Sequence, residues 1–176
     1  AFNSCTNLES IWVPASVTTI EWAAFVRCSN LKSIQVDANN SAFSSIDGNL
    51  YTNDATELIQ YAAGKSDTSF EIPAGVTYIH STAFRESINL ITITIPASTT
   101  GIYDNVFSDC IRLENIYVNT DNTHYCSIDG NLYTYSQKSL IAYAAGKTDA
   151  FFEIPSSVIY IGDRAFSNCS ALSEIS

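Results

Sequence analysis

The sequence repeats itself at a spacing of 82 residues, and this repetition constrains the fold more than any other feature. The seven residues Ser45–Tyr51 recur unchanged at Ser127–Tyr133, and the five residues Tyr61–Lys65 recur unchanged at Tyr143–Lys147. Within each unit, an Ala-Phe, Cys, Leu, Ile pattern returns at alternating offsets of 23 and 59 residues. Such a chain must stack its turns, because a single turn cannot bury apolar residues on both of its sides.

The shorter offset gives the architecture of one turn. Ile11–Val13 alternates inward and outward, as a strand with one buried face does, and Pro14 ends the strand because it has no amide hydrogen. Ala24, Cys28 and Leu31 follow at three- and four-residue spacing, which predicts a short helical or 3₁₀ segment. A period in the low twenties is the leucine-rich-repeat length. We therefore expect a leucine-rich-repeat solenoid, mostly β, with one parallel ladder sheet.

The longer offset contains an insertion. Asp47-Gly48 and Asp129-Gly130 lie between short apolar strands and predict two-residue β-hairpin turns. We interpret each insertion as a hairpin that projects from the stack, with a turn at Gly64-Lys65 before the chain re-enters the ladder. The expected organisation is a single domain over 1–176, with short repeats near 1–36 and 83–118 and long repeats near 37–82 and 119–164. Both ends fall inside a repeat, so we expect a fragment of a longer protein.

One stretch of the sequence carries a family resemblance. The pattern I-P-x-x-V-x-x-I-G-x-x-A-F-x-x-C-x-x-L-x-x-I over residues 154–175 resembles the BspA-like leucine-rich repeats. This resemblance implies a bacterial or protist protein of the cell surface, or a secreted one, that works in adhesion or protein binding, and it supplies no catalytic residues. The sequence departs from the pattern at Glu21, His80 and Tyr103, where the family prefers Gly, and at Ser87, which replaces Cys.

The charge argues against two classes of partner. The formal net charge is −10 with 8 Lys plus Arg, whereas nucleic acids and anionic membranes are bound through clustered basic residues. No apolar run approaches the roughly 18 residues of a membrane helix. We therefore expect no nucleic-acid partner and no membrane insertion of this segment.

The five cysteines show no metal-binding pattern, because no C-x-x-C occurs and the spacings are wide. Four of them share one register in the repeat. Cys5 and Cys28 could form a disulfide between adjacent turns, or the slot could simply hold a small buried side chain, as Ser87 in the same register suggests. Cys126 has Ser44 as its counterpart and is interpreted as a partly exposed thiol. We predict no metal and no cofactor.

Other polar residues lack a catalytic arrangement. His80 and His124 lie far apart in sequence, and neither has a counterpart in the other unit, so both are interpreted as surface histidines. The segments 37–40 and 119–122 are rich in side-chain oxygens, which can bind calcium, but Asx-turns explain them as well. The sequence therefore does not predict an enzyme.

A binding surface is predicted on the outward face of the ladder sheet, where one residue from each turn forms a continuous row. Trp12 and Tyr117 would be its anchors, because exposed aromatic residues dominate recognition surfaces. The row consists of Trp12, Gln35, Glu71, Thr94, Tyr117 and Glu153. A second row two residues earlier consists of Ser10, Ser33, Ser69, Thr92, Asn115 and Phe151. A purely solvated sheet is the alternative. The rival site is the tyrosine-rich hairpins, with Tyr51, Tyr61, Tyr133, Tyr135 and Tyr143.

Two hypotheses about function follow. The first is a surface or secreted interaction module that binds a protein or a glycan on a host or neighbouring cell. The second is a structural spacer with no ligand of its own. Because the terminal turns carry no polar cap, end-to-end self-association is a further expectation.

Overall fold

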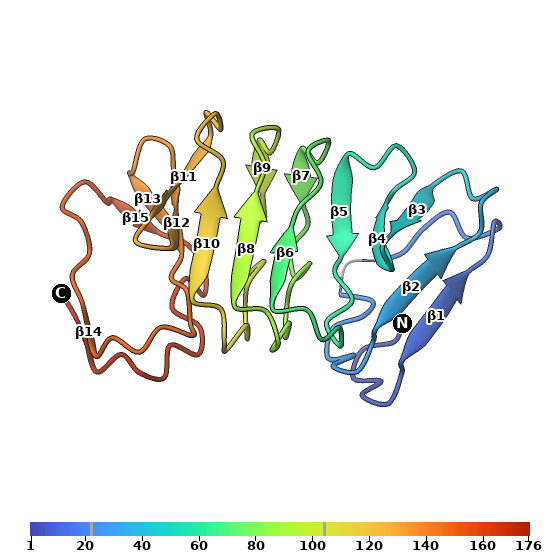
Figure 1. The fold of residues 1–176 in the computed structure, drawn as a ribbon, viewed down its shortest axis with the longest axis horizontal. Helices are drawn as coiled ribbons and strands as arrows, with labels where there is room; N and C mark the ends of the chain where they lie inside the picture. Colours follow the sequence, from blue (N-terminus) through green and yellow to red (C-terminus); the bar gives the residue numbers. More distant parts are fainter. Residues whose placement is uncertain (22, 104) are drawn as a thin grey trace.

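The structure is a computed structural model that describes residues 1–21, 23–103 and 105–176. It is a β-solenoid of seven successive turns. Figure 1 shows the strands of successive turns side by side along the long axis of the molecule. Seven strands, one from each turn, form what we call the ladder sheets. They are β1 (Ser10–Val13), β2 (Ser33–Val36), β6 (Ser69–Glu71), β8 (Thr92–Ile95), β10 (Asn115–Val118), β14 (Phe151–Phe152) and β16 (Glu174–Ile175).

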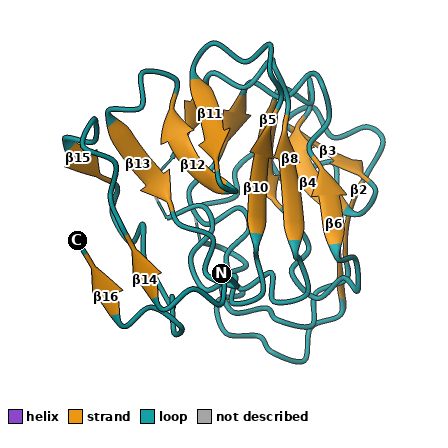
Figure 2. Cartoon of the chain, turned by 60° about the vertical axis from the view of Figure 1, so that its left-hand side comes forward, coloured by secondary structure: helices purple, strands orange, loops and turns teal. Residues whose placement is uncertain are grey.

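The remaining strands lie on another side of the turns and form two sheets, which we call the back sheets (Figure 2). The first contains β3 (Phe43–Ile46), β4 (Asn49–Thr52), β5 (Glu57–Gln60), β7 (Tyr78–Ile79) and β9 (Gly101–Ile102). The second contains β11 (Tyr125–Ile128), β12 (Asn131–Thr134), β13 (Ser139–Ala142) and β15 (Tyr160–Ile161).

The ladder strands pair in parallel with the register of the sequence repeat. Ile11 pairs with Ile34, and Ile93 pairs with Ile116, so equivalent residues of successive turns lie side by side. Ile34, Ile93 and Ile116 are fully buried, whereas Trp12 is 57% exposed. The predicted solenoid, with its inward and outward alternation, is therefore confirmed.

The predicted continuity of the ladder sheet is wrong. Three separate ladder sheets form, β1–β2, β6–β8–β10 and β14–β16. The hairpin turns of the long repeats cause the interruption: the amide of Ile34 donates to the carbonyl of Gly48 at 2.8 Å, and the amide of Ile116 donates to that of Gly130 at 2.8 Å. Because the hairpin turn satisfies these amides, it takes the place of the next ladder strand.

The predicted hairpin turns are confirmed, but their projection from the stack is wrong. Asp47 and Gly48 have φ of 50° and 73°, as a two-residue primed turn requires, and Ile46 pairs with Asn49 across it. The strands do not project, because β5 pairs in parallel with β7 and the side chains of Leu50 and Tyr51 are fully buried. The hairpin is thus part of the solenoid wall, since its apolar face has to be buried in the core.

The predicted helical or 3₁₀ segments are also wrong, for the described residues form no helix. The chain at these corners instead makes consecutive turns. Two residues have positive φ in every such corner except the first, as do Ala23 (61°) and Arg27 (62°), and the first corner has Ser4 (67°). These left-handed residues break any helical run. Amides then bond to the adjacent turn, as when Phe84 donates to the carbonyl of Val106 at 3.1 Å. Hydrogen bonds between turns therefore replace those within a helix.

The repeated Y-A-A-G-K motif closes the long turn tightly. The amide of Gly64 donates to the carbonyl of Leu31 at 2.8 Å, and a Cβ on Gly64 would lie 2.2 Å from the carbonyl carbon of Asn30. Lys65 donates from Nζ to the carbonyl of Asp47 at 2.6 Å, which ties this corner to the hairpin turn. A glycine is required here by the close backbone approach.

The oxygen-rich loops are structural turns. The Asn40 side chain is 2% exposed, donates to the carbonyls of Pro14 and Val17, and accepts from the amides of Ala42 and Phe43. Its counterpart Asn122 makes the equivalent four bonds. These amides connect each long turn to the preceding short turn. The Asx-turn interpretation is the one that the geometry supports, as Asn39 donates its amide to the Asp37 carboxylate.

Candidate functional site

The residues predicted for the ladder face separate into three groups. Trp12 and Gln35 pair on the first ladder sheet, and both are exposed. Glu71, Thr94 and Tyr117 lie in one row across β6, β8 and β10, with Tyr117 at 48% exposure. Glu153 directly follows the short strand β14 of the third ladder sheet and is exposed. The two aromatic anchors therefore stand on different sheets.

The second predicted row is divided in the same way. Ser10 pairs with Ser33 on the first ladder sheet, and Thr92 pairs with both Ser69 and Asn115 on the middle sheet. Phe151 pairs with Glu174, which lies outside the predicted row, on the third sheet. Most of these side chains are small and polar. The middle sheet β6–β8–β10 is the widest of the three, and in it Tyr117 pairs with Thr94, which pairs with Glu71.

The rival site in the hairpins is mostly core. Tyr51, Tyr61, Tyr133 and Tyr143 are 5% exposed or less, and Tyr61 stacks against Phe70 and Phe84. Burial raises the pKa of Tyr143 to about 12 and raises the pKa of Tyr51 further. Tyr135, at 58% exposure, is the one of the five that remains available at the surface.

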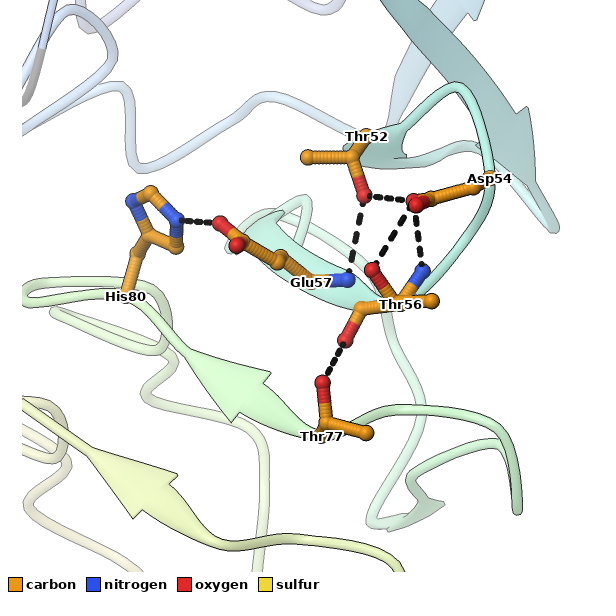
Figure 3. Close-up of polar contacts among 6 residues, drawn as sticks. All are labelled: Thr52, Asp54, Thr56, Glu57, Thr77 and His80. Carbon is orange, nitrogen blue, oxygen red and sulfur yellow. Dashed lines mark hydrogen bonds and ion pairs between the residues drawn. The ribbon is translucent and has the colours of Figure 1, made fainter.

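A second exposed group, which the sequence did not single out, lies on the outer face of the first back sheet. Glu57, Tyr78 and Gly101 are in register across β5, β7 and β9, and His80 and Tyr103 directly follow the last residues of β7 and β9. We call Glu57, Tyr78, His80 and Tyr103 the tyrosine patch. Nε2 of His80 lies 2.6 Å from the Glu57 carboxylate, as Figure 3 shows. The Tyr103 ring centroid is 5.7 Å from that of His80 and 6.5 Å from that of Tyr78.

A hydrogen-bonded turn holds the acidic end of this patch. Thr52 and Thr56 donate their hydroxyls to Asp54 at 2.7 and 2.9 Å, and the amide of Glu57 donates to the Thr52 hydroxyl at 3.1 Å (Figure 3). The hydrogen bonds that Asp54 accepts from Thr52, the largest cause, and from Thr56 lower the pKa of its carboxyl group, because they stabilise the charged form. The hydroxyl of Thr77 donates to the carbonyl of Thr56 and attaches β7 to the same turn.

The second unit offers an internal comparison for the patch. At an offset of 82 residues, Glu57 corresponds to Ser139, His80 to Gly162, and Asp54 to Ser136. The strands there pair with the same register, Ser139 with Tyr160. The fold therefore does not require the carboxylate or the imidazole. This comparison is the signal by which the sequence alone could have identified the patch.

A hollow of about 260 Å³ adjoins the patch where the first short turn meets the hairpin sheet. It is lined among others by Ile20, Phe25, Phe43, Ile59, Gln60 and His80. The corresponding place in the second unit measures about 10 Å³, and there Asn105 and Val106 stand in place of Ala23 and Ala24.

The thiols and histidines do not form a reactive centre within the described residues. All five cysteines are free thiols. The predicted small core side chain is confirmed for Cys28 and Cys110, which are buried, whereas Cys169 is half-buried and Cys5 is exposed. Burial raises the pKa of the Cys110 thiol to about 12, and Cys126 is half-buried with a raised pKa. His124 is exposed and contacts Thr123. No group of three potential metal ligands occurs among the described residues, and they contain no helix that could span a membrane.

Comparison with known families decides the classification. The model of the BspA-type leucine-rich repeat region matches in six copies over residues 1–56, 59–142 and 142–176. The chain belongs to the BspA-type leucine-rich repeat family. Among curated proteins, no sequence match to the chain is found.

Solved structures with the same fold include two leucine-rich proteins and a pneumococcal antigen. A leucine-rich cell surface protein of Faecalibacterium prausnitzii is 29% identical, with a TM-score of 0.70 over 96% of this chain and 47% of that chain. The pneumococcal vaccine antigen PcpA is 24% identical, with a TM-score of 0.71 over 96% of this chain and 38% of that one. A leucine-rich repeat protein of Eubacterium ventriosum is 21% identical, with a TM-score of 0.63 over 96% and 48%. The chain thus spans less than half the length of these three, and the latter two show the fold alone.

Proposed function

We propose that this BspA-type segment is a protein-interaction module of a cell-surface or secreted protein, and that it binds its partner through the ladder face. The observation that carries the proposal is the exposure of Trp12 and Tyr117, at 57% and 48%, on sheets whose other outward side chains in the two rows are polar. Large exposed aromatic residues are the usual anchors of protein interfaces. The repeat fold supports a binding role, because stacked turns present extended surfaces.

Two further features support a role in recognition at the cell surface. The F. prausnitzii relative is described as a cell surface protein, which supports an extracellular setting for this chain. The outer row contains the acidic residues Glu71 and Glu153 and no basic residue, so its charge is negative. A partner on a host or neighbouring cell, either a protein or a glycan-bearing protein, is the class that this surface suits best.

The test is a binding experiment with matched variants. Trp12→Ala and Tyr117→Ala remove the proposed anchors, whereas Tyr135→Ala removes an equally exposed tyrosine that lies off the ladder face. The unmodified segment is immobilised and exposed to host-cell surface extracts, from which it should retain a partner. Trp12→Ala and Tyr117→Ala should bind this partner with roughly tenfold lower affinity, because the loss of one interface anchor costs about 1.4 kcal/mol of binding free energy. Equal retention by all three variants would refute the ladder-face assignment. If a solenoid of equal length with an unrelated surface restores the function of the whole protein, the segment is a spacer instead.

A further inference from the structure

The tyrosine patch combines exposed aromatic rings with carboxylates on an otherwise flat sheet face. Tyr78 and Tyr103 are 41% and 53% exposed, and the Glu57 and His80 side chains are about one-third exposed, at 37% and 34%. Glu57 and Tyr78 are direct cross-strand neighbours. An aromatic ring beside a carboxylate is the arrangement that attracts a cationic side chain, through the ring quadrupole and through direct charge attraction.

The residues of the patch are not explained by folding. The second unit carries Ser139 and Gly162 in place of Glu57 and His80 and keeps the same strand pairing. Tyr103 corresponds to Glu21 one unit earlier. Tyr78, in contrast, packs its ring against the backbone of Gly101, where a Cβ would lie 2.2 Å from the ring. The sheet therefore presents Tyr78 in a fixed position, whereas Glu57 and His80 are specific to the first unit and Tyr103 to the short repeat that follows it.

Among the described residues, Glu57 contacts the imidazole of His80 but forms no ion pair with Lys or Arg. The ion pairs that Lys and Arg make among the described residues lie elsewhere, between Arg27 and Glu86, Lys32 and Glu9, Lys65 and Asp67, and Arg85 and Asp109. Exposed Asp54 stands at the neighbouring turn. With 18 acidic and 8 basic residues in the whole chain, the field around the patch attracts a positively charged partner.

The spacing of the rings suits one cation. The two ring centroids are 6.5 Å apart and the rings are inclined at 36°. A cation about 4.5 Å above the midpoint would be about 5.5 Å from both centroids, which is inside the roughly 6 Å range of a cation–π contact. One guanidinium or ammonium group could therefore contact both tyrosines.

We propose that the tyrosine patch binds an arginine or lysine side chain in a basic segment of the protein partner. This proposal deepens the proposed function by naming a second contact surface, on the back sheet, and the chemistry that it recognises. A neutral saccharide would use the rings but not the carboxylate, so the two classes of ligand respond differently to removal of Glu57.

The experiment is an NMR titration of the ¹⁵N-labelled chain with three probes. These are the peptide acetyl-Gly-Arg-Gly-Arg-Gly amide, its counterpart with Glu in place of Arg, and the trisaccharide of N-acetylglucosamine. The arginine peptide should shift the amide signals of residues 77–80 and 101–103, and the shifts should diminish when the salt concentration is raised, because exposed charges are screened. The glutamate peptide should produce no such shifts.

Four variants identify the residues responsible. Tyr103→Leu keeps apolar bulk but removes the ring, and Gly101→Ala displaces the Tyr78 ring. The double variant Glu57→Ser with His80→Gly copies the residues of the second unit, so the fold accepts it. Each should weaken binding of the arginine peptide, roughly two- to fivefold for the loss of one exposed cation–π contact. Tyr160→Ala, at the position equivalent to Tyr78 in the second unit, is the control and should leave the affinity unchanged.

Three results would overturn the proposal. These are absence of shifts at the patch with the arginine peptide, equal shifts with the glutamate peptide, or shifts with the trisaccharide that persist in the Glu57→Ser, His80→Gly variant. The spectrum of each variant reports whether it is folded. Failure here leaves the ladder-face test unaffected, because Trp12 and Tyr117 belong to other sheets.

Discussion

The buried asparagines Asn40 and Asn122 allow the energy of the turn-to-turn connection to be tested. Asn122 is 1% exposed, donates to the carbonyls of Pro96 and Thr99 at 2.8 and 2.9 Å, and accepts two backbone amides at 2.8 Å. At about 1 kcal/mol for each hydrogen bond, Asn122→Ala removes about 4 kcal/mol. Water can reach some of the released groups, since His124 is exposed. We therefore expect the free energy of unfolding to fall by about 2–4 kcal/mol.

Two matched variants separate this effect from simple loss of a side chain. Asn119→Ala removes an exposed side chain that accepts one amide, that of Asp121, and should cost less than about 1 kcal/mol. Asn122→Asp keeps the acceptor but turns a carboxylate oxygen toward two carbonyls, and it should cost at least as much as Asn122→Ala. Asn40→Ala should behave like Asn122→Ala, because it loses the same four bonds.

Urea unfolding followed by circular dichroism measures these differences, with the slope of each transition checked for equality before midpoints are compared. If Asn122→Ala unfolds within 1 kcal/mol of Asn119→Ala, or if Asn122→Asp is as stable as the unmodified chain, the side chain does not hold the turns together and the reasoning from its four bonds is wrong.

Two further predictions concern the tight corner and the buried titratable groups. Gly64→Ala should lower the free energy of unfolding by about 3 kcal/mol, because the new Cβ would lie 2.2 Å from the Asn30 backbone. Gly75→Ala, with no atom within 4 Å of the new Cβ, should raise it by roughly 0.5 kcal/mol, because alanine reduces the conformational entropy of the unfolded chain. Thermal unfolding of both variants checks this, and similar changes in both would contradict it. Burial raises the pKa of Cys110 to about 12 from 9.0 and that of Tyr143 to about 12 from 10.0. The folded state therefore retains protons that the unfolded chain releases, and the stability present below about pH 9 should decline toward pH 12. The urea midpoint should fall between about pH 9 and 12, less so in Cys110→Ser, and a constant midpoint would rule out this linkage.

The features predicted correctly are those set by short-range chemistry. Alternation in Ile11–Val13 gives the ladder strands, and Asp47-Gly48 gives the hairpin turn, because both depend on neighbouring residues alone. The helical corners were predicted wrongly, since the spacing of Ala24 and Cys28 also fits consecutive turns. The left-handed residues Ala23 and Arg27 that break the helix are not glycines, so they carry no signal in the sequence.

The remaining differences arise from pairing between distant segments. The interruption of the ladder depends on the bond from Ile34 to Gly48, and the inclusion of the hairpin in the wall depends on the pairing of Leu58 with Ile79. Neither follows from a local pattern. For the candidate sites, exposure of Trp12 and Tyr117 follows from alternation, whereas the contact of His80 with Glu57 joins two strands 23 residues apart.

The two long units together separate the residues that build the fold from those free to act in recognition. Residues identical in both units, such as the Asp-Gly turns and the Y-A-A-G-K corners, have structural explanations in the hydrogen bonds and close contacts described above. Residues that differ while the strand register is kept, Glu57 against Ser139 and His80 against Gly162, lack such an explanation. A solenoid can therefore change its exposed side chains one unit at a time without altering its stacking. This independence is why we assign recognition on the back sheet to the place where the first unit meets the second, although both units have the same fold.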